Sequence, residues 1–189
     1  MKSIDYKDCT NITECAERSI EGLAEIYWKE YPEYIRQLPS ILKNCESYRE
    51  LGTNQGGSAS VALLQKLKYY ELIDKSFKNF NPIKKYFDEY TKENNIEICY
   101  REMSSLEVNT IVKTDFILID SVHKYNHVTK EIKKYEPLTK KYMMFHDTIS
   151  YPGVREAVIS FLTENKHWKI VEEQTVTPGY IVLGRINEK

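Results

Sequence analysis

An unbroken apolar run, Phe-Ile-Leu-Ile at residues 116–119, constrains the fold more than any other feature of this chain. A strand with apolar side chains at every position has both faces covered, which is typical of parallel sheets packed between layers of helices. The run therefore predicts a buried strand at 115–120 and favours an α/β architecture.

The segments around this strand alternate between expected strands and helices. The last two expected strands are joined only by a loop containing Pro178-Gly179, which is too short for a crossover helix, so the final strand runs antiparallel to its neighbour. We predict a Rossmann-like open parallel sheet of about seven strands, with helices on both faces and a C-terminal antiparallel strand. The expected strands are 48–52, 69–74, 96–101, 115–120, 142–146, 168–174 and 180–186.

A helical N-terminal segment, residues 1–45, is expected to pack on a single domain formed by residues 46–189. Asn11, with Glu14 three positions later, is typical of a helix N-terminus. Apolar residues then recur at helical spacing until Pro32, which is expected to end the helix.

Four aromatic residues of this segment leave two interpretations open. They pack in the core, as most such stripes do, or they cover a ligand cleft and stack on a planar or sugar-ring ligand. These residues are Tyr27, Trp28, Tyr31 and Tyr34.

Charge and hydropathy exclude several classes of protein. Lys and Arg number 27 and Asp and Glu number 28, which gives a net charge of -1, so a nucleic-acid partner is not expected. No apolar run reaches the roughly 18 residues of a membrane-spanning helix and the chain starts with a polar segment, so we expect a cytoplasmic protein that does not bind membranes. The four cysteines lack paired spacing and are expected to be reduced thiols. Whether the chain forms a homo-oligomer stays open.

Polar residues gather where the expected strands end. Ligands of open parallel sheets lie beyond the carboxyl ends of the strands, so these residues are the candidate site, although a strand-terminal aspartate can also simply cap the next helix. They are 50–52, Asp74, Arg101 with the loop 103–105, Asp120, and His146 with Asp147.

The glycine-rich segment 50–58 is the most specific motif. Gly52 permits a tight turn, and Gly56 and Gly57 let backbone N–H groups approach a ligand closely. A dinucleotide fingerprint would need glycine at position 54, where Asn54 stands instead. Glu50 would repel a pyrophosphate and suits a positively charged group.

Together these motifs resemble class I S-adenosylmethionine-dependent methyltransferases, most closely the small-molecule and sugar O-methyltransferase group. The segment 50–58 resembles the ExGxxxGxS motif of that group, and Asp120 with His123 and His146 with Asp147 resemble its DxxH and HD motifs. The resemblance covers about residues 46–186. Ser121 replaces a usual glycine, and the glycine pair that normally precedes strand five is absent.

The resemblance implies S-adenosylmethionine as cofactor. The glycine-rich turn would hold its methionine half, Asp74 its ribose hydroxyls and the 103–105 loop its adenine, while Asp120 would lie near the methyl group. The implied cofactor-binding residues are Glu50, Gly52, Asn54, Gly56, Gly57, Ser58, Asp74, Ser104, Ser105 and Asp120.

In some relatives the residues that match Asp120, His146 and Asp147 bind a divalent cation. Mg²⁺ or Mn²⁺ is therefore a second candidate cofactor, although a mixed nitrogen and oxygen set fits Mg²⁺ less well and also admits Fe²⁺ or Zn²⁺. The alternative is that His146 points into the sheet interior and Asp147 caps a turn.

His123 competes with a metal for the catalytic role. An imidazole near Asp120 could act as general base for an acceptor hydroxyl. His127 and His167 are expected at the surface.

The predicted function is an S-adenosylmethionine-dependent O-methyltransferase that acts on a small-molecule hydroxyl, such as that of a sugar or a hydroxylated metabolite. Two alternatives stay open: an NAD(P)-dependent oxidoreductase, against which Asn54 argues, and a non-catalytic S-adenosylmethionine-binding protein.

Overall fold

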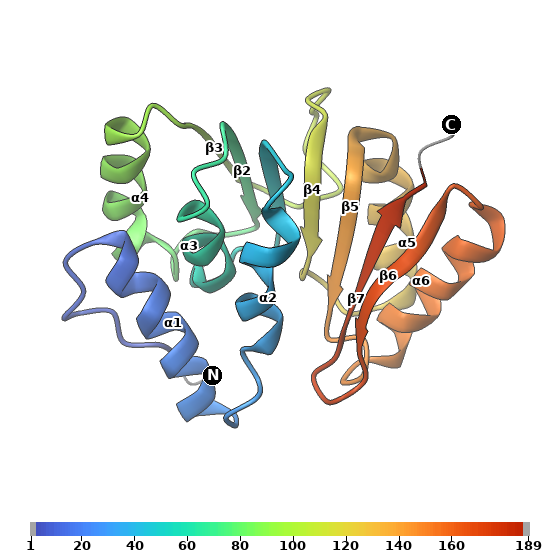
Figure 1. Ribbon diagram of the computed structural model, residues 1–189, viewed down its shortest axis with the longest axis horizontal. Coiled ribbons are helices and arrows are strands. Elements are labelled where there is room, and N and C mark those ends of the chain that lie inside the picture. The colour runs from blue at the N-terminus through green and yellow to red at the C-terminus, as the bar shows by residue number, and fades with distance from the viewer. Residues whose placement is uncertain (1–2, 187–189) are drawn as a thin grey trace.

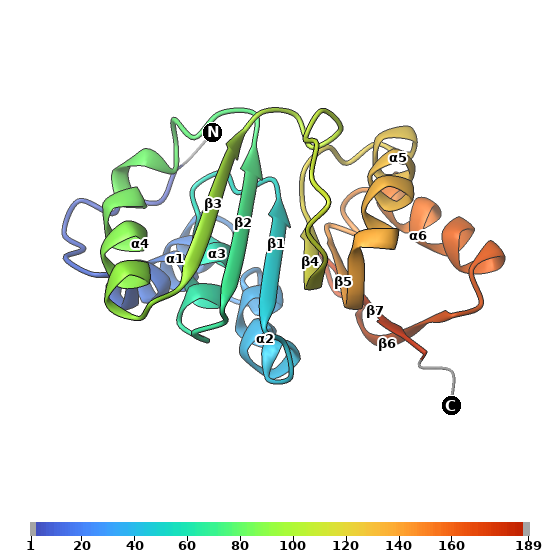
Figure 2. The ribbon, with the colours of Figure 1, turned by 90° about the horizontal axis from the view of Figure 1, so that it is seen from above.

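The strands form one seven-stranded sheet in the order β3-β2-β1-β4-β5-β7-β6 (Figure 1). This computed structural model describes residues 3–186. Strands β1 to β5 pair in parallel, and β7 pairs antiparallel with both β5 and β6 (Figure 2). The predicted Rossmann-like class and its antiparallel last strand are confirmed. The strands are β1 (Ser47–Leu51), β2 (Tyr69–Asp74), β3 (Glu97–Glu102), β4 (Thr114–Ile119), β5 (Thr139–His146), β6 (Trp168–Gln174) and β7 (Tyr180–Arg185).

Helices cover both faces of the sheet, as expected (Figure 1). The α-helices are α1 (Ile12–Ile26), α2 (Glu33–Leu42), α3 (Gly57–Leu63), α4 (Asn81–Glu93), α5 (Tyr125–Tyr135) and α6 (Pro152–Glu164). Helices α1 to α4 share one hydrophobic cluster with Phe116 and Leu118 of β4, whereas α5 and α6 share a second cluster with Ile117 and Ile119. The apolar run of β4 is unbroken because its side chains alternate between these two clusters.

Helix α1 begins as predicted but ends early. The side chain of Asn11 accepts a hydrogen bond from the Glu14 N–H at 3.0 Å. The helix ends at Ile26 rather than at Pro32, because the backbone of Tyr27 leaves the helical conformation and Tyr31 donates its N–H to the Trp28 carbonyl at 2.9 Å in a turn. The rings of Tyr27 and Tyr31 stack with centroids 4.0 Å apart. A second helix, α2, follows with a proline inside it. Tyr27, Trp28 and Tyr31 therefore lie on a turn between two helices, and Tyr34 lies in α2.

Strand β5 is longer than expected. A short 3₁₀ turn, Glu136–Leu138, leads directly into the strand at Thr139, so no glycine pair is needed there. The other strand boundaries lie within one residue of the predicted ones.

Two further observations bear on the predicted class of protein. No helix in residues 3–186 is both long enough and apolar enough to cross a membrane. The four cysteines are free thiols, and burial raises the pKa of both Cys15 and Cys45 to about 12.

Candidate active site

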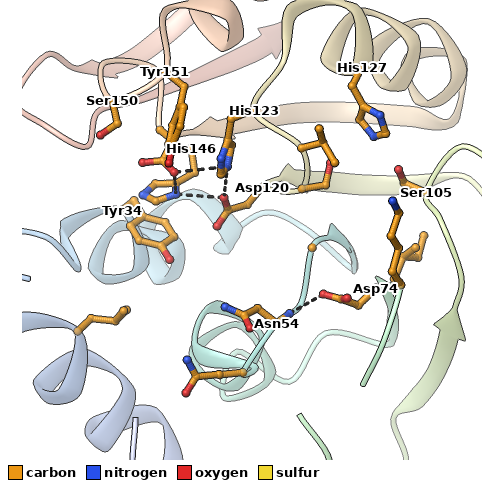
Figure 3. A pocket seen from close by; sticks show the side chains of 18 of the residues that line it. Tyr34, Asn54, Asp74, Ser105, Asp120, His123, His127, His146, Ser150 and Tyr151 are labelled. Carbon is orange, nitrogen blue, oxygen red and sulfur yellow. Dashed lines mark hydrogen bonds and ion pairs between the residues drawn. The ribbon is translucent and has the colours of Figure 1, made fainter. Parts of the chain in front are cut away.

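A cavity of about 590 Å³ lies beyond the carboxyl ends of the strands (Figure 3). Its volume is within the range of small-molecule and cofactor sites. The residues after β1, β2, β3, β4 and β5 form its floor and sides, and the end of α1, the following turn and the start of α2 form the opposite wall. The predicted site residues that line it are Gly52, Asn54, Asp74, Ser105, Asp120, His123, His146 and Asp147.

Gly52 brings the ends of β1 and β4 together. Its φ is +94°, and a Cβ there would lie 2.0 Å from the backbone oxygen of Asp120. Asp120 in turn donates its N–H to the Leu51 carbonyl at 2.9 Å. Only glycine fits this close approach, so the turn holds Asp120 at the cavity.

The second part of the glycine-rich turn supports the cavity without lining it. A Cβ on Gly56, whose φ is +79°, would lie 2.7 Å from the ring of Phe80, so glycine is needed there for packing on α4. Glu50, Gly57 and Ser58, and Ser104 in the loop after β3, are also not among the residues that line the cavity. The expectation that these residues bind the cofactor stays a prediction.

Glu50 lies buried beneath the turn. Its carboxylate accepts hydrogen bonds from the Tyr48 hydroxyl, at 2.8 Å, and from the Ser58 hydroxyl. Burial raises the pKa of Glu50 to about 8, which these two hydrogen bonds only partly offset. Its role in the structure is therefore to anchor the start of α3 to β1.

Asp74 and Asn54 form a polar pair on the cavity wall. Oδ2 of Asp74 accepts the Asn54 N–H at 2.7 Å, and Oδ1 accepts the Ser76 N–H at 3.0 Å. Asn54 has a φ of +47°, and its side-chain oxygen accepts from Asn79 at 3.0 Å. Each carboxylate oxygen of Asp74 holds one backbone hydrogen bond and retains acceptor capacity for a ligand hydroxyl.

A buried carboxylate, Glu131, was missed by the sequence analysis. It accepts hydrogen bonds from the hydroxyls of Ser105 and Ser121, and it lies 3.3 Å from Nε2 of His127. Burial raises the pKa of Glu131. The spacing of His127 and Glu131, four residues apart on one helix, is the signal that could have indicated the pair.

The expected surface position of His127 is wrong. Its side chain is 19% exposed and lines the cavity. His167 is partly exposed, and its Nε2 lies 3.1 Å from Oε1 of Glu136. It is not among the residues that line the cavity.

Four side chains from the ends of β4 and β5 form one cluster (Figure 3). Nε2 of His123 lies 3.2 Å from Asp120 Oδ1 and 3.4 Å from Asp147 Oδ2. Nδ1 of His146 lies 3.2 Å from the same Asp120 oxygen and 3.8 Å from the same Asp147 oxygen. The sequence motifs therefore converge in space.

The cluster perturbs the acidity of its members. Burial opposes ionisation of Asp120, but His146 and His123 outweigh it and lower the pKa of Asp120 to about 2. Burial also opposes the charged form of His123, yet its hydrogen bond to Asp120 and the nearby carboxylates raise its pKa. Burial and the charge of Asp120 raise the pKa of Asp147. The cluster thus favours the ionised form of Asp120 and disfavours the ionised form of Asp147.

His146 faces the cavity and not the sheet interior. Its side chain is only 2% exposed, and its ring stacks on Tyr34 with centroids 3.8 Å apart. Among the described residues, neither ring nitrogen has a partner in hydrogen-bond geometry. Asp120, His146 and Asp147 each offer a ligand atom within 4.8 Å of the others, so these residues fit a metal ion.

The wall opposite this cluster is aromatic. Tyr27 is 41% exposed and Trp28 38% exposed, and the rings of Trp28 and Tyr31 are nearly perpendicular with centroids 5.0 Å apart. Tyr34, in contrast, is buried beneath His146. The exposed rings leave an apolar surface that a ligand in the cavity can contact.

Comparison with known proteins gives a fold-level match. No protein-family model matches the sequence, and no curated protein matches it. An O-methyltransferase of Bacillus cereus in complex with S-adenosylhomocysteine matches with a TM-score of 0.66 and 14% identity, over 90% of this chain and 90% of that one.

Two further solved structures match over nearly the whole chain. The N-methyltransferase NodS of Bradyrhizobium japonicum, in complex with S-adenosylhomocysteine, has a TM-score of 0.59 and 17% identity, over 95% of this chain and 100% of that one. A methyltransferase of Podospora anserina bound to S-adenosylhomocysteine has a TM-score of 0.63 and 12% identity, over 97% of this chain and 92% of that one. The chain thus has the Rossmann-like fold found in S-adenosylmethionine-dependent methyltransferases.

Proposed function

We propose that this chain is an S-adenosylmethionine-dependent O-methyltransferase that acts on a hydroxyl of a small molecule. The observation that carries the proposal is that one cavity holds both the Asp74 carboxylate, which retains acceptor capacity, and the cluster of two carboxylates and two imidazoles around Asp120. The structural neighbours that bind S-adenosylhomocysteine support it. The resemblance of the sequence motifs to those of small-molecule and sugar O-methyltransferases supports an oxygen atom as the methyl acceptor.

The cofactor would lie across the strand ends. Asp74 would accept hydrogen bonds from the two ribose hydroxyls, and Ser105 with the neighbouring loop would flank the adenine. Gly52 and Asn54 would contact the methionine half, while Glu50, Gly56, Gly57 and Ser58 would hold the turn in shape. When bound, S-adenosylmethionine supplies an electrophilic methyl group on a sulfonium.

The chain's own residues would orient the acceptor and take its proton. The aromatic wall would fix the acceptor ring, so that its hydroxyl faces the Asp120 cluster. Nε2 of His123 would then accept the hydroxyl proton, with Asp120 stabilising the imidazolium. Asp120, His146 and Asp147 would hold a divalent cation such as Mg²⁺ or Mn²⁺, which would supply Lewis acidity beside the acceptor hydroxyl.

The acceptor class rests on the cavity and on the charge of the chain. A sugar or a hydroxylated metabolite suits a cavity with exposed aromatic rings on one wall and carboxylates on the other. A nearly neutral chain does not suit a nucleic acid as acceptor.

Calorimetric titration of the purified chain with S-adenosylhomocysteine and, separately, with NADH tests the cofactor. We expect binding of the first only, and binding of NADH alone would refute the proposal in favour of an oxidoreductase. A panel of hydroxylated acceptors, assayed by S-adenosylhomocysteine release, then tests catalysis. Cofactor binding without turnover on any acceptor of the panel would support a non-catalytic binding protein.

A further inference from the structure

We propose that Glu131 is a positioning residue that selects the base of the cofactor. It holds the hydroxyls of Ser105 and Ser121 so that they can only accept hydrogen bonds from a ligand, which favours a base that carries an amino group. The inference rests on the proposed function, which places the adenine of S-adenosylmethionine beside Ser105. Glu131 is not among the residues that line the cavity, so it acts through the two serines.

Glu131 joins two loops that are far apart in the sequence. The chain after β3 crosses over β2 and β1 to reach β4 (Figure 2). Oε1 of Glu131 accepts a hydrogen bond from the Ser121 hydroxyl at 2.6 Å and another from the Ser105 hydroxyl. Nε2 of His127 lies 3.3 Å from the same oxygen. Three side chains of the cavity wall thus converge on one oxygen of a buried carboxyl group.

The direction of these hydrogen bonds decides what the serines offer to a ligand. A serine hydroxyl has one proton and two lone pairs, and here both protons point to Glu131. Ser105 and Ser121 therefore present only lone pairs to the cavity. An amino group has two N–H donors, one for each serine oxygen, whereas an oxo group in its place would meet lone pairs. A serine could turn its proton to the oxo group only by giving up its hydrogen bond to Glu131.

The arrangement holds in both protonation states of Glu131. Burial raises the pKa of Glu131, which favours the neutral acid. Oε1 accepts both serine protons, and Oε2 has no hydrogen-bond partner among residues 3–186, so Oε2 is the oxygen that would carry a proton. A carboxylic acid keeps its other oxygen as an acceptor, and the serine hydroxyls therefore keep their orientation.

Two other hydrogen bonds from α5 hold the backbone of the loop after β3. The Tyr135 hydroxyl donates to the Ser105 carbonyl at 2.6 Å. Nζ of Lys134 donates to the Leu106 carbonyl at 2.7 Å. These bonds position the loop, whereas Glu131 orients the hydroxyl protons. The two effects can therefore be separated by mutation.

Calorimetric titration with S-adenosylhomocysteine and with S-inosylhomocysteine, in which an oxo group replaces the amino group of the base, tests the inference. We expect the wild type to bind the amino compound at least about tenfold more tightly, because the oxo compound leaves the serine oxygens unpaired. Glu131→Leu frees both hydroxyls to donate, so the ratio of the two Kd values should fall at least about fivefold. A merely structural loss would weaken both compounds alike and leave the ratio unchanged.

Tyr135→Phe is the matched control, because it removes a hydrogen bond to the same loop and leaves the Ser105 hydroxyl with Glu131. It should keep the wild-type ratio, whatever its effect on the two separate affinities. Ser121→Ala is the second variant if Glu131→Leu does not fold by circular dichroism. It removes one of the two acceptors, so it should lower the ratio as well.

Three results would overturn the inference. They are a wild-type ratio within about twofold of one, an unchanged ratio in the folded Glu131→Leu or Ser121→Ala variant, and an equal fall of the ratio in Tyr135→Phe. Failure of the proposed function is distinguishable, because S-adenosylhomocysteine would then not bind the wild type at all. Binding of S-adenosylhomocysteine with a ratio near one would retain the cofactor and remove only the role of Glu131.

Discussion

Replacing Asp74 by asparagine tests where the cofactor's ribose lies. Both carboxylate oxygens already accept one backbone hydrogen bond, from Asn54 and Ser76, and each retains capacity for one ribose hydroxyl. An amide keeps one accepting oxygen, without charge, so at least one charge-assisted hydrogen bond to the ribose is lost. Such a bond contributes about 1.5 to 3 kcal/mol, which corresponds to a roughly 10- to 150-fold rise in the Kd for S-adenosylhomocysteine.

Isothermal titration calorimetry at constant pH and salt measures this change. Asp8→Asn is the control, because Asp8 is exposed on the N-terminal segment and its replacement removes the same charge. Thermal unfolding of the ligand-free variants checks that the turn around Asn54 remains folded. A Kd for Asp74→Asn within about twofold of the Asp8→Asn value would refute the placement of the ribose.

Three other perturbations test the turn, the buried acid and the aromatic wall. Gly52→Ala should lower the free energy of unfolding by at least about 1 to 3 kcal/mol in urea titrations, because its Cβ meets the Asp120 carbonyl at a positive φ. Gly57→Ala is the control, because the nearest atom to its Cβ, on Ser19, lies 3.5 Å away. An equal loss of stability in both variants would contradict this cause. The pKa of Glu50 is raised from 4.5 to about 8, so the folded state holds a proton that the unfolded state releases. Stability should therefore fall as the pH rises from about 5 to 8, by up to about 1.4 kcal/mol per pH unit, and Glu50→Gln should flatten this slope; an unchanged slope would speak against the buried acid. Trp28→Ala should raise the KM for the acceptor identified by the screen and leave S-adenosylhomocysteine affinity unchanged, whereas a matching loss of cofactor affinity would remove Trp28 from the acceptor wall.

The sheet could be predicted because its signals are local. The run at 116–119 indicates a strand covered on both faces, and the short loop around Pro178 requires an antiparallel last strand. The end of α1 could not be predicted in the same way, because the chain leaves the helix at Tyr27 and enters a turn closed between Trp28 and Tyr31. Helical spacing continues through both residues, so the pattern alone does not indicate where the chain leaves the helix.

The same distinction between local signals and contacts between distant segments applies to the candidate site. Asp74 and Asp120 lie at the cavity as the strand-end rule predicts. Gly56 packs against Phe80, which lies just before α4, and this contact between distant segments is not visible in the glycine pattern. Glu131 was missed because its burial and its hydrogen bonds come from serines in two other loops. Properties that depend on contacts between distant segments are not visible in the sequence pattern.

Two kinds of segment line the cavity, and this arrangement affects how acceptor specificity can change. The residues proposed to bind the cofactor and carry out the chemistry come from several strand ends, whereas the opposite wall from Leu23 to Tyr34 is one continuous piece of chain. The helices flanking this piece are packed into the same hydrophobic cluster as α3 and β1, so their frame persists when the turn between them changes. A recombination event or a short randomised cassette that is confined to the turn and keeps Tyr34 beneath His146 can therefore replace the proposed acceptor-facing surface and leave the residues proposed for the chemistry unchanged.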